Sequence, residues 1–246
     1  MRLAGRETVP LSIKSRKQMK RTLPFVIITL VLASALLAAW YMKRSTGETS
    51  HIAPPASPTS GNRASSIKLG ADPPQTLGTA DAPVMLEEFG DFECQSCGLL
   101  HPILQQMKAE FGSRLVIVFR EYPLAAKHEH ALAAARAAEA AGLQGKFWEM
   151  HNRLYENQKA WHESSSVQTL FEEYAEGIGL ALDRFKQDMS SEIVEERIAL
   201  DRERGQSIGI NSTPTVFLNG REVPLASLSA DSLRELIKAQ IASGGN

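Results

Sequence analysis

Apolar and polar residues follow strand and helix patterns from Val84 onwards. The run 84–89, Val-Met-Leu-Glu-Glu-Phe, lies between Ala82-Pro83 and Gly90 and predicts a strand, and the nearly continuous apolar run 115–119 predicts a strand buried on both faces. Between them, Leu100, Leu104 and Met107 have helical spacing within 97–111. A strand, a helix and a second strand in this order predict a βαβ unit with a parallel pair of strands.

The pattern is helical for a long stretch after Pro123. Eight of the eleven residues from 131 to 141 are alanine, and Gly142 provides a stop signal. Apolar stripes at helical spacing follow in 147–154, 167–178 and 182–189, and then a charged helix runs through Arg204. These stripes predict a packed helical core rather than a cofactor site.

Strand signals return near the C-terminus. The segments 214–218 and 221–223 flank Asn219-Gly220, the strongest short signal for a β-hairpin, and a last helix begins near Ser229 or Asp231. This order predicts one α/β domain over residues 78–246, with a helical insertion at about 125–207.

The N-terminus predicts a membrane anchor. Residues 1–21 are basic, and the uncharged segment 22–42 is long enough to span about 30 Å of hydrocarbon. Positive charge before the segment places residues 1–21 in the cytoplasm and the rest of the chain outside it. A cleaved signal peptide is the main alternative, because it also begins with a basic region, and a buried core helix is a weaker one.

Composition changes after the predicted anchor. Residues 43–77 are rich in Ser, Thr, Pro, Gly and Ala, which predicts a disordered linker. Residues 45–246 contain 18 basic and 27 acidic residues, a net charge of −9, and no basic stripe. This charge argues against nucleic acid as a partner. Export would place the two cysteines in an oxidising compartment.

The chain's two cysteines, Cys94 and Cys97, lie at the start of the first predicted helix. Free amide groups and the helix dipole favour a thiolate at Cys94, and Cys97 follows one turn later on the same face. A disulfide closing so short a ring stabilises little, and zinc would need two more ligands, of which His101 could supply one. The spacing therefore favours a redox pair over a metal site or an inert disulfide.

Several short motifs occur in a fixed order between residues 78 and 242. They are Gly78-Thr79-Ala80-Asp81-Ala82-Pro83, Glu88-Phe89, Asp91-Phe92-Glu93-Cys94, Arg120-Glu121-Tyr122-Pro123-Leu124, Lys146-Phe147-Trp148 and Ser212-Thr213-Pro214-Thr215. Together they resemble the DsbA-like branch of the thioredoxin superfamily. The resemblance implies a thioredoxin-like α/β fold, a central mixed sheet flanked by helices, with a helical insertion. The uncharged segment 22–42 adds a preceding transmembrane helix to this fold. No flavin, nicotinamide or metal site is visible, so we expect the dithiol itself to be the redox group, without a cofactor.

The resemblance also implies roles outside the two cysteines. Thr213-Pro214 corresponds to a loop in which family members have a cis-proline beside the disulfide, and the backbone of Thr213 would pair with an extended substrate peptide. An ordinary trans-proline is the alternative. Glu88 matches the buried acid of the family, which would have a raised pKa and exchange a proton with Cys97. Its alternative is a polar residue on the open face of a strand.

The dipeptide between the cysteines departs from the family pattern. It is Gln95-Ser96, whereas strongly oxidising members often have Pro-His or Pro-Tyr. Without an imidazolium there, the Cys94 thiolate loses one source of stabilisation, which leaves the direction of electron flow open. His101 either assists as a cation or is a helix-surface residue without a role.

The sequence therefore predicts a membrane-tethered thiol-disulfide oxidoreductase whose catalytic domain lies in the periplasm or another extracytoplasmic space. The resemblance implies cysteine-containing exported proteins as substrates and a membrane quinone-linked partner that re-oxidises the pair. One rival is a reductase or isomerase of the same fold, although residues 45–77 are too short and polar for the dimerisation domain that isomerases add. A second rival is a copper-binding module that uses Cys94, Cys97 and His101.

Four other histidines lie in the predicted domain. His128 and His130 form a His-x-His pair that could bind metal, but no third histidine or cysteine lies near them in the sequence. We interpret His151 as a helix-face residue and His162 as a loop residue, and assign a role to neither.

Overall fold

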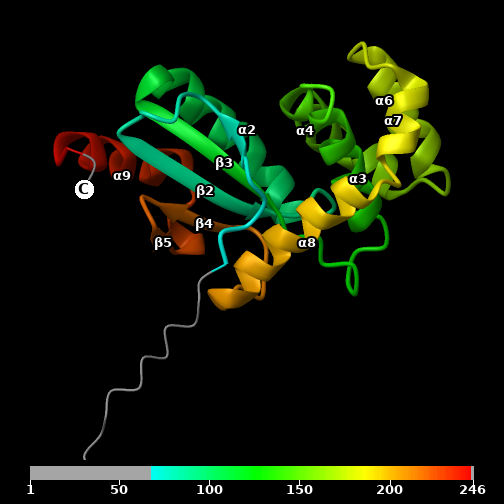
Figure 1. Cartoon of the computed structure of the whole chain (residues 1–246). Helices are drawn as coiled ribbons and strands as arrows, with labels where there is room; N and C mark the ends of the chain where they lie inside the picture. Colours follow the sequence, from blue (N-terminus) through cyan, green and yellow to red (C-terminus); the bar gives the residue numbers. More distant parts are fainter. Residues whose placement is uncertain (1–67, 245–246) are drawn as a thin grey trace, which may run out of the picture. The chain divides into compact units, whose positions relative to one another are not determined.

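A five-stranded mixed sheet lies at the centre of the domain (Figure 1). The computed structural model describes residues 68–244, so the predicted basic segment, the predicted anchor and residues 43–67 of the predicted linker lie outside the described residues. The strands, in their order across the sheet, are β1 (Gln75–Leu77), β3 (Leu115–Glu121), β2 (Val84–Gly90), β4 (Thr215–Leu218) and β5 (Arg221–Val223). Within the described range, no helix combines the length and the apolar character needed to cross a membrane.

The central strands confirm the predicted βαβ unit. Strands β2 and β3 are parallel, and helix α2 (Gln95–Phe111) connects them through a short 3-10 turn at Gly112–Arg114. All seven residues of β3 are buried, as its continuous apolar run predicted. The remaining neighbours pair antiparallel, so the sheet is mixed.

Helix α2 packs with the C-terminal helix α9 (Ala230–Ala242) over one face of the sheet. Alternate residues of each strand point to that face, so Leu86 and Ile117 enter a core with apolar side chains of both helices. Glu88 lies two residues after Leu86 and therefore points toward the same face. Glu87 points to the opposite face.

The helices between β3 and β4 form a second core. They are α3 (Ala131–Gly142), α4 (Phe147–Glu156), α5 (Gln158–His162), α6 (Val167–Gly177), α7 (Leu182–Asp188) and α8 (Glu192–Ser207). Figure 1 shows these helices gathered beyond one end of the sheet, with α8 running back along it. The alanines of α3 permit close packing against α4 and α8. Phe92 and Phe119 belong to the same core and connect it to the strands.

The β-hairpin predicted near the C-terminus of the chain is present. Strands β4 and β5 pair antiparallel, and Asn219 and Gly220 between them have φ angles of 46° and 76°. Positive φ at both positions is what a type I′ turn requires, and the Asn-Gly pair accommodates it. A short 3-10 turn, Leu225–Ser227, then leads to α9.

The prediction of a disordered linker was wrong for residues 68–77. Strand β1 lies at 75–77 and pairs antiparallel with β3, and Ala71 is buried. The backbone of Ala71 is held on both sides, since its N–H donates to Asp201 Oδ1 and its carbonyl oxygen accepts from Arg120 Nη1, each at 2.8 Å. These are polar contacts to distant residues, which the local composition of the segment does not reveal.

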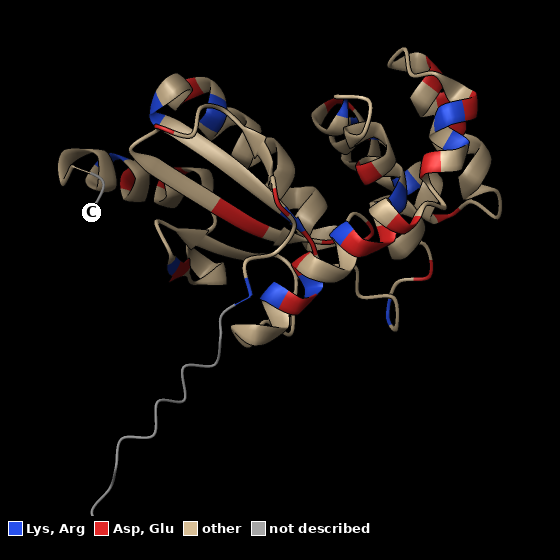
Figure 2. Ribbon diagram, viewed as in Figure 1, with Lys and Arg blue, Asp and Glu red and all other residues tan. Residues whose placement is uncertain are grey.

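Buried charges join the sheet to α8. Figure 2 shows an acidic segment within β2 and alternating charges along α8. Glu87 accepts hydrogen bonds from Arg120 at 2.9 Å and from Arg204 at 2.8 Å, and Arg120 donates to Asp201 at 2.9 Å. These paired charges account for the presence of Glu87 in a central strand.

Candidate active site

A buried aspartate shapes the turn that precedes Cys94. Asp91 Oδ1 accepts the N–H of Glu93 at 2.8 Å, and the carbonyl oxygen of Asp91 accepts the N–H of Cys94 at 3.1 Å. The second carboxylate oxygen, Oδ2, accepts from the N–H of Leu124 and pairs with His128 Nδ1, each at 2.8 Å. Asp91 thus fixes the backbone from which α2 begins.

The two cysteines take the positions that the sequence predicted. Cys94 is the N-cap residue of α2, and Cys97 lies in its first turn. Cys97 is fully buried, whereas Cys94 keeps 9% of its surface exposed, and both are free thiols in this structure. An incoming sulfur can therefore reach Cys94 but not Cys97.

The surroundings of Cys94 favour its thiolate. Its pKa falls from 9.0 to about 5, first because the Cys97 thiol hydrogen-bonds to it, and further because Thr213 and the N–H groups of Cys97 and Ser96 do so, against the opposing effect of burial. The Thr213 hydroxyl is buried, and with Cys94 in its thiol form it has no hydrogen-bond partner. The Cys97 thiol, this hydroxyl and the helix N–H groups thus take the place of the imidazolium that Gln95-Ser96 lacks.

Glu88 and Cys97 form a buried pair in which both pKa values are raised, whereas that of Cys94 is lowered. Burial, and then the negative charge of Cys94, raise the pKa of Glu88 to about 8. Burial, the hydrogen bond to Cys94 and the charge of Glu88 together raise the pKa of the Cys97 thiol well above its usual value. Glu88 is 2% exposed, so the alternative of a polar residue on an open face is wrong. At neutral pH both groups hold a proton.

The loop before β4 lies against the reactive sulfur. The Thr213–Pro214 peptide bond is cis, as the resemblance implied, and Cys94 Sγ donates a hydrogen bond to the carbonyl oxygen of Thr213 at 3.3 Å. The structure thus brings together the predicted residues Cys94, Cys97, Glu88, Thr213 and Pro214, with Gln95 and Ser96 exposed at the start of α2.

Gln158 of α5 holds the backbone around Cys94 from the side of the helices. Its Nε2 donates to the carbonyl oxygens of Phe92 at 2.6 Å and of Cys94 at 2.9 Å. A Cβ added at Gly98 would lie 2.5 Å from Gln158 Oε1. A side chain at position 98 would therefore push Gln158 away from both carbonyls.

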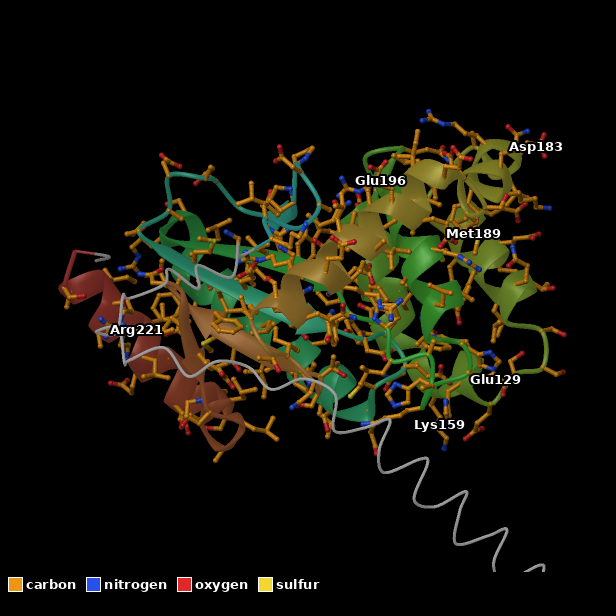
Figure 3. All side chains as sticks on the ribbon, turned by 60° about the horizontal axis from the view of Figure 1, so that its bottom comes forward. Glu129, Lys159, Asp183, Met189, Glu196 and Arg221 are labelled. Carbon is orange, nitrogen blue, oxygen red and sulfur yellow. The ribbon has the colours of Figure 1, made fainter. Side chains whose placement is uncertain are left out.

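Two recesses flank the Cys-x-x-Cys motif. One has a volume of about 160 Å³ and is lined mainly by apolar residues, namely Leu99, Leu100, Ile103, Pro214, Leu225 and Leu228, with Ser96. The other, of about 540 Å³, is lined by polar residues, namely Glu93, Gln95, His128, Gln158, Lys159, His162 and Glu163. Figure 3 labels Lys159 on α5, at the same end of the helical block as Glu129.

The histidines differ from their sequence interpretations. His101 is 9% exposed, so the alternative of a helix-surface residue was wrong. His151 lies on a face of α4, as predicted, but that face is buried and its side chain is 4% exposed. Their ring centroids are 5.4 Å apart, and both rings pack against Tyr155. His162 lies on α5 rather than in a loop, and its Nδ1 pairs with Glu93 at 2.9 Å.

The described residues offer no metal site. Within 68–244, no group of three or more His, Cys, Asp or Glu side chains is arranged to hold a metal ion. Cys94, Cys97 and His101 do not form such a group, and neither do His128 and His130.

Comparisons with known proteins agree with this geometry. The family model described as Thioredoxin matches residues 71–239. The chain belongs to the thioredoxin family. The structure of a thioredoxin-like oxidoreductase from Silicibacter pomeroyi superposes with a TM-score of 0.55 at 28% identity and covers 72% of this chain and 98% of that one. The oxidised BdbD of Bacillus subtilis superposes with a TM-score of 0.61 at 24% identity and covers 69% and 93%.

The chain therefore shares the thioredoxin-like fold with these proteins. Curated relatives include a Na(+)/H(+) antiporter NhaA 1 from Mycolicibacterium vanbaalenii, 40% identical over 145 residues. That match covers 58% of this chain and 23% of the antiporter. The antiporter activity in the name belongs to that much longer protein.

Proposed function

We propose that this protein donates its Cys94–Cys97 disulfide to cysteine-containing exported proteins. The main support for this proposal is the low pKa of Cys94, about 5, because a stabilised thiolate favours the reduced form of the pair. A pair whose reduced form is stabilised is a strong oxidant. This argument favours an oxidase over a reductase or isomerase of the same fold, despite the Gln95-Ser96 dipeptide.

The proposed reaction has two exchange steps. A substrate thiolate attacks Cys94 Sγ, which forms a mixed disulfide and breaks the Cys94–Cys97 bond, and the leaving Cys97 thiolate takes the proton of Glu88. A second substrate thiolate then attacks the substrate sulfur of the mixed disulfide. The substrate becomes oxidised, Cys94 leaves as a thiolate, and two electrons now reside in the dithiol.

The substrate would bind as an extended segment across Cys94. The backbone of Thr213 lies beside the sulfur and offers groups that can pair with a peptide backbone. The apolar recess of Leu99, Ile103 and Leu225 lies on the Ser96 side of the motif, and the polar recess lies on the Gln95 side. Both are open to a chain that crosses the reactive sulfur.

The proposed location rests on the charge and hydropathy of the N-terminal segments, and the proposed partner rests on the family resemblance. The basic segment 1–21 and the uncharged segment 22–42 support a single-pass anchor with the catalytic domain in the periplasm or another extracytoplasmic space. A membrane quinone-linked protein would re-oxidise the dithiol. Fractionation of cells that express the full chain tests the anchor. Recovery of the intact chain from the soluble fraction would contradict it.

The reduction potential of the full chain, measured by equilibration with glutathione buffers, decides the direction of electron flow. We expect a value nearer to about −120 mV, that of the oxidant DsbA, than to about −270 mV, that of thioredoxin. A value at or below that of thioredoxin would support the reductase instead. Failure to form any disulfide, with one copper ion bound per chain, would support the copper-binding module.

A further inference from the structure

A small cavity separates Glu88 from the two buried histidines. Its volume is about 10 Å³, and its polar lining comes from Glu88, His101, Gln105 and His151, with Trp148 beside them. This volume is about the least that holds one water molecule. The cavity is distinct from both recesses that flank Cys94.

Two polar atoms at this cavity are buried without a partner. They are Glu88 Oε1 and His151 Nε2. His151 Nδ1 lies 3.3 Å from Asn152 Oδ1, an acceptor, so Nδ1 carries the hydrogen of the neutral ring and Nε2 presents a lone pair. Burial holds the ring neutral, since it lowers the pKa of His151 to about 3. A protonated Glu88 presents a donor, so the two unpaired groups are complementary.

The proposed reaction needs a proton path to this place. After Glu88 gives its proton to Cys97 it takes up another from solvent, because at neutral pH both groups of the reduced protein hold a proton. Glu88 must release that proton before it can accept the one of Cys97 when the disulfide forms again, yet its side chain is buried and its Oε1 has no hydrogen-bond partner. His101 lies farther out, with Nε2 at 3.0 Å from Asn152 Oδ1 and 3.3 Å from Gln105 Nε2. Gln105 is only half buried.

We propose that one water in this cavity, bonded to Glu88 Oε1 and His151 Nε2, and the neighbouring His101 carry protons between Glu88 and solvent. His151 is a positioning residue that holds the water, and His101 is the outer group of the path. The proposal rests on the proposed function, because it supplies the proton that the Cys97 step uses.

Other titratable groups near Glu88 do not offer the same route. The titratable groups that shift the pKa of Glu88, or of the groups beside it, are Cys94 and Cys97 at the start of α2, Glu121 of β3 and Tyr155 of α4. The Tyr155 hydroxyl is also buried without a partner, and its pKa is raised well above its usual value, first by burial. It does not line the cavity.

The test follows the Cys97 step alone. Reduced full-length protein is mixed with glutathione disulfide, samples are quenched with acid, and mass spectrometry measures the lifetime of the Cys94–glutathione adduct. The adduct disappears when Cys97 gives its proton to Glu88 and attacks Cys94 Sγ, which releases glutathione as the leaving thiolate. His151→Phe keeps an aromatic ring in the cluster, and His101→Gln keeps an amide within reach of Asn152.

We expect both variants to lengthen the adduct lifetime about 10- to 100-fold, within the range for loss of a positioned proton-transfer group. Their reduction potentials should equal that of the wild type, because the path changes a rate and not an equilibrium. The wild-type lifetime should increase in heavy water. Tyr155→Phe, the matched control in the same aromatic cluster, should leave the lifetime unchanged.

Three outcomes would overturn the proposal. Lifetimes within twofold of the wild type in both histidine variants would exclude the path, and a long lifetime in Tyr155→Phe alone would assign it to the tyrosine. Slowing that comes with an equal change in reduction potential would indicate a structural effect. A wild type that forms no adduct at all would overturn the proposed function itself.

Discussion

Cys94 Sγ donates a hydrogen bond to the carbonyl oxygen of Thr213, a residue 119 positions further along the chain. This contact joins the start of α2 to the loop before β4. The reactivity of the sulfur therefore depends on both segments, and the Thr213 side chain adds to the stabilisation of the thiolate. The Cys-x-x-Cys spacing predicts the role of the first segment. The role of the second was predicted only from the family resemblance.

The first prediction concerns the pH dependence of alkylation at Cys94. Because the pKa is about 5, the thiolate fraction is half at that pH, and the alkylation rate should fall below it and level off about one to two pH units above it. Iodoacetamide labelling of the reduced protein, followed by mass spectrometry, measures the profile. In Cys94→Ser the remaining Cys97, whose pKa is raised, should stay unlabelled throughout this range. A midpoint near the ordinary cysteine value of 9.0 would contradict the prediction.

Thr213→Val should make the pair less oxidising. The substitution removes a hydroxyl that stabilises the Cys94 thiolate, and a loss of about 1.4 kcal/mol corresponds to about 30 mV in the reduction potential. Equilibration with glutathione buffers measures the shift. Thr215→Val is the matched control, because its hydroxyl donates to Ser212 and does not contact the sulfur. Equal shifts in the two variants would argue against the assigned contact.

Glu88→Gln should change the dependence of stability on pH. With a folded pKa of about 8 against 4.5, the wild-type carboxyl binds a proton more tightly in the folded state. Its stability contribution is thus fully present below pH 4.5 and is lost as pH rises through 8. The neutral glutamine avoids this loss, so the reduced variant should gain a few kcal/mol relative to the wild type between pH 5 and 8, at about 1.4 kcal/mol per pKa unit. Urea unfolding at both pH values measures the gain, and parallel curves for the two proteins would refute it.

The same variant should slow the Cys97 step. Glutamine cannot accept the Cys97 proton, and loss of a general base costs about 100-fold or more. The lifetime of the Cys94–glutathione adduct measures this step. Initial attack at Cys94 should remain within a few-fold of the wild type, which separates the effect from general damage to the site. An unchanged adduct lifetime would remove Glu88 from the mechanism.

Asp201→Ala should destabilise the fold without altering the redox site. Asp201 accepts from Ala71 N–H and from Arg120, and its loss leaves a buried cation with an incomplete set of partners. Removing one partner of a buried pair costs about 3–5 kcal/mol. Urea unfolding measures the loss. The control is Asp231→Ala at an exposed pair with Arg234, which should cost much less stability. Comparable losses in the two variants would show that the buried network contributes little.

Much of the fold follows from local sequence. The continuous apolar run of β3, the alanines of α3 and the Asn219-Gly220 turn each specify one element through a property that neighbouring residues share. The redox pair is equally local, because a Cys-x-x-Cys at a helix start needs no distant partner to be recognised. The family resemblance was necessary for Glu88 and Pro214, whose positions beside the sulfurs depend on sheet pairing.

Residues that act through distant contacts could not be predicted in this way. Strand β1 is three residues long, and the segment before it is held by Arg120 and Asp201 rather than by an apolar pattern. His101 gave a usable signal, since it follows Leu100 on the apolar side of α2 and lies four residues after Cys97. His151 lies next to Met150 on the buried side of α4 in the same way. Both histidines occupy core positions of their helices, but a polar side chain does not contribute to the apolar pattern from which core positions are predicted.

The contact between Gln158 and the backbone at Phe92 and Cys94 has a consequence for protein engineering. The motif consists of four consecutive residues, but its backbone is held by an amide that the chain supplies from α5, and Gly98 leaves room for that amide. A graft of Cys94 to Cys97 into another scaffold would carry the sulfurs without their clamp. The smallest transferable unit is therefore discontinuous, and it includes a glutamine encoded more than sixty codons downstream.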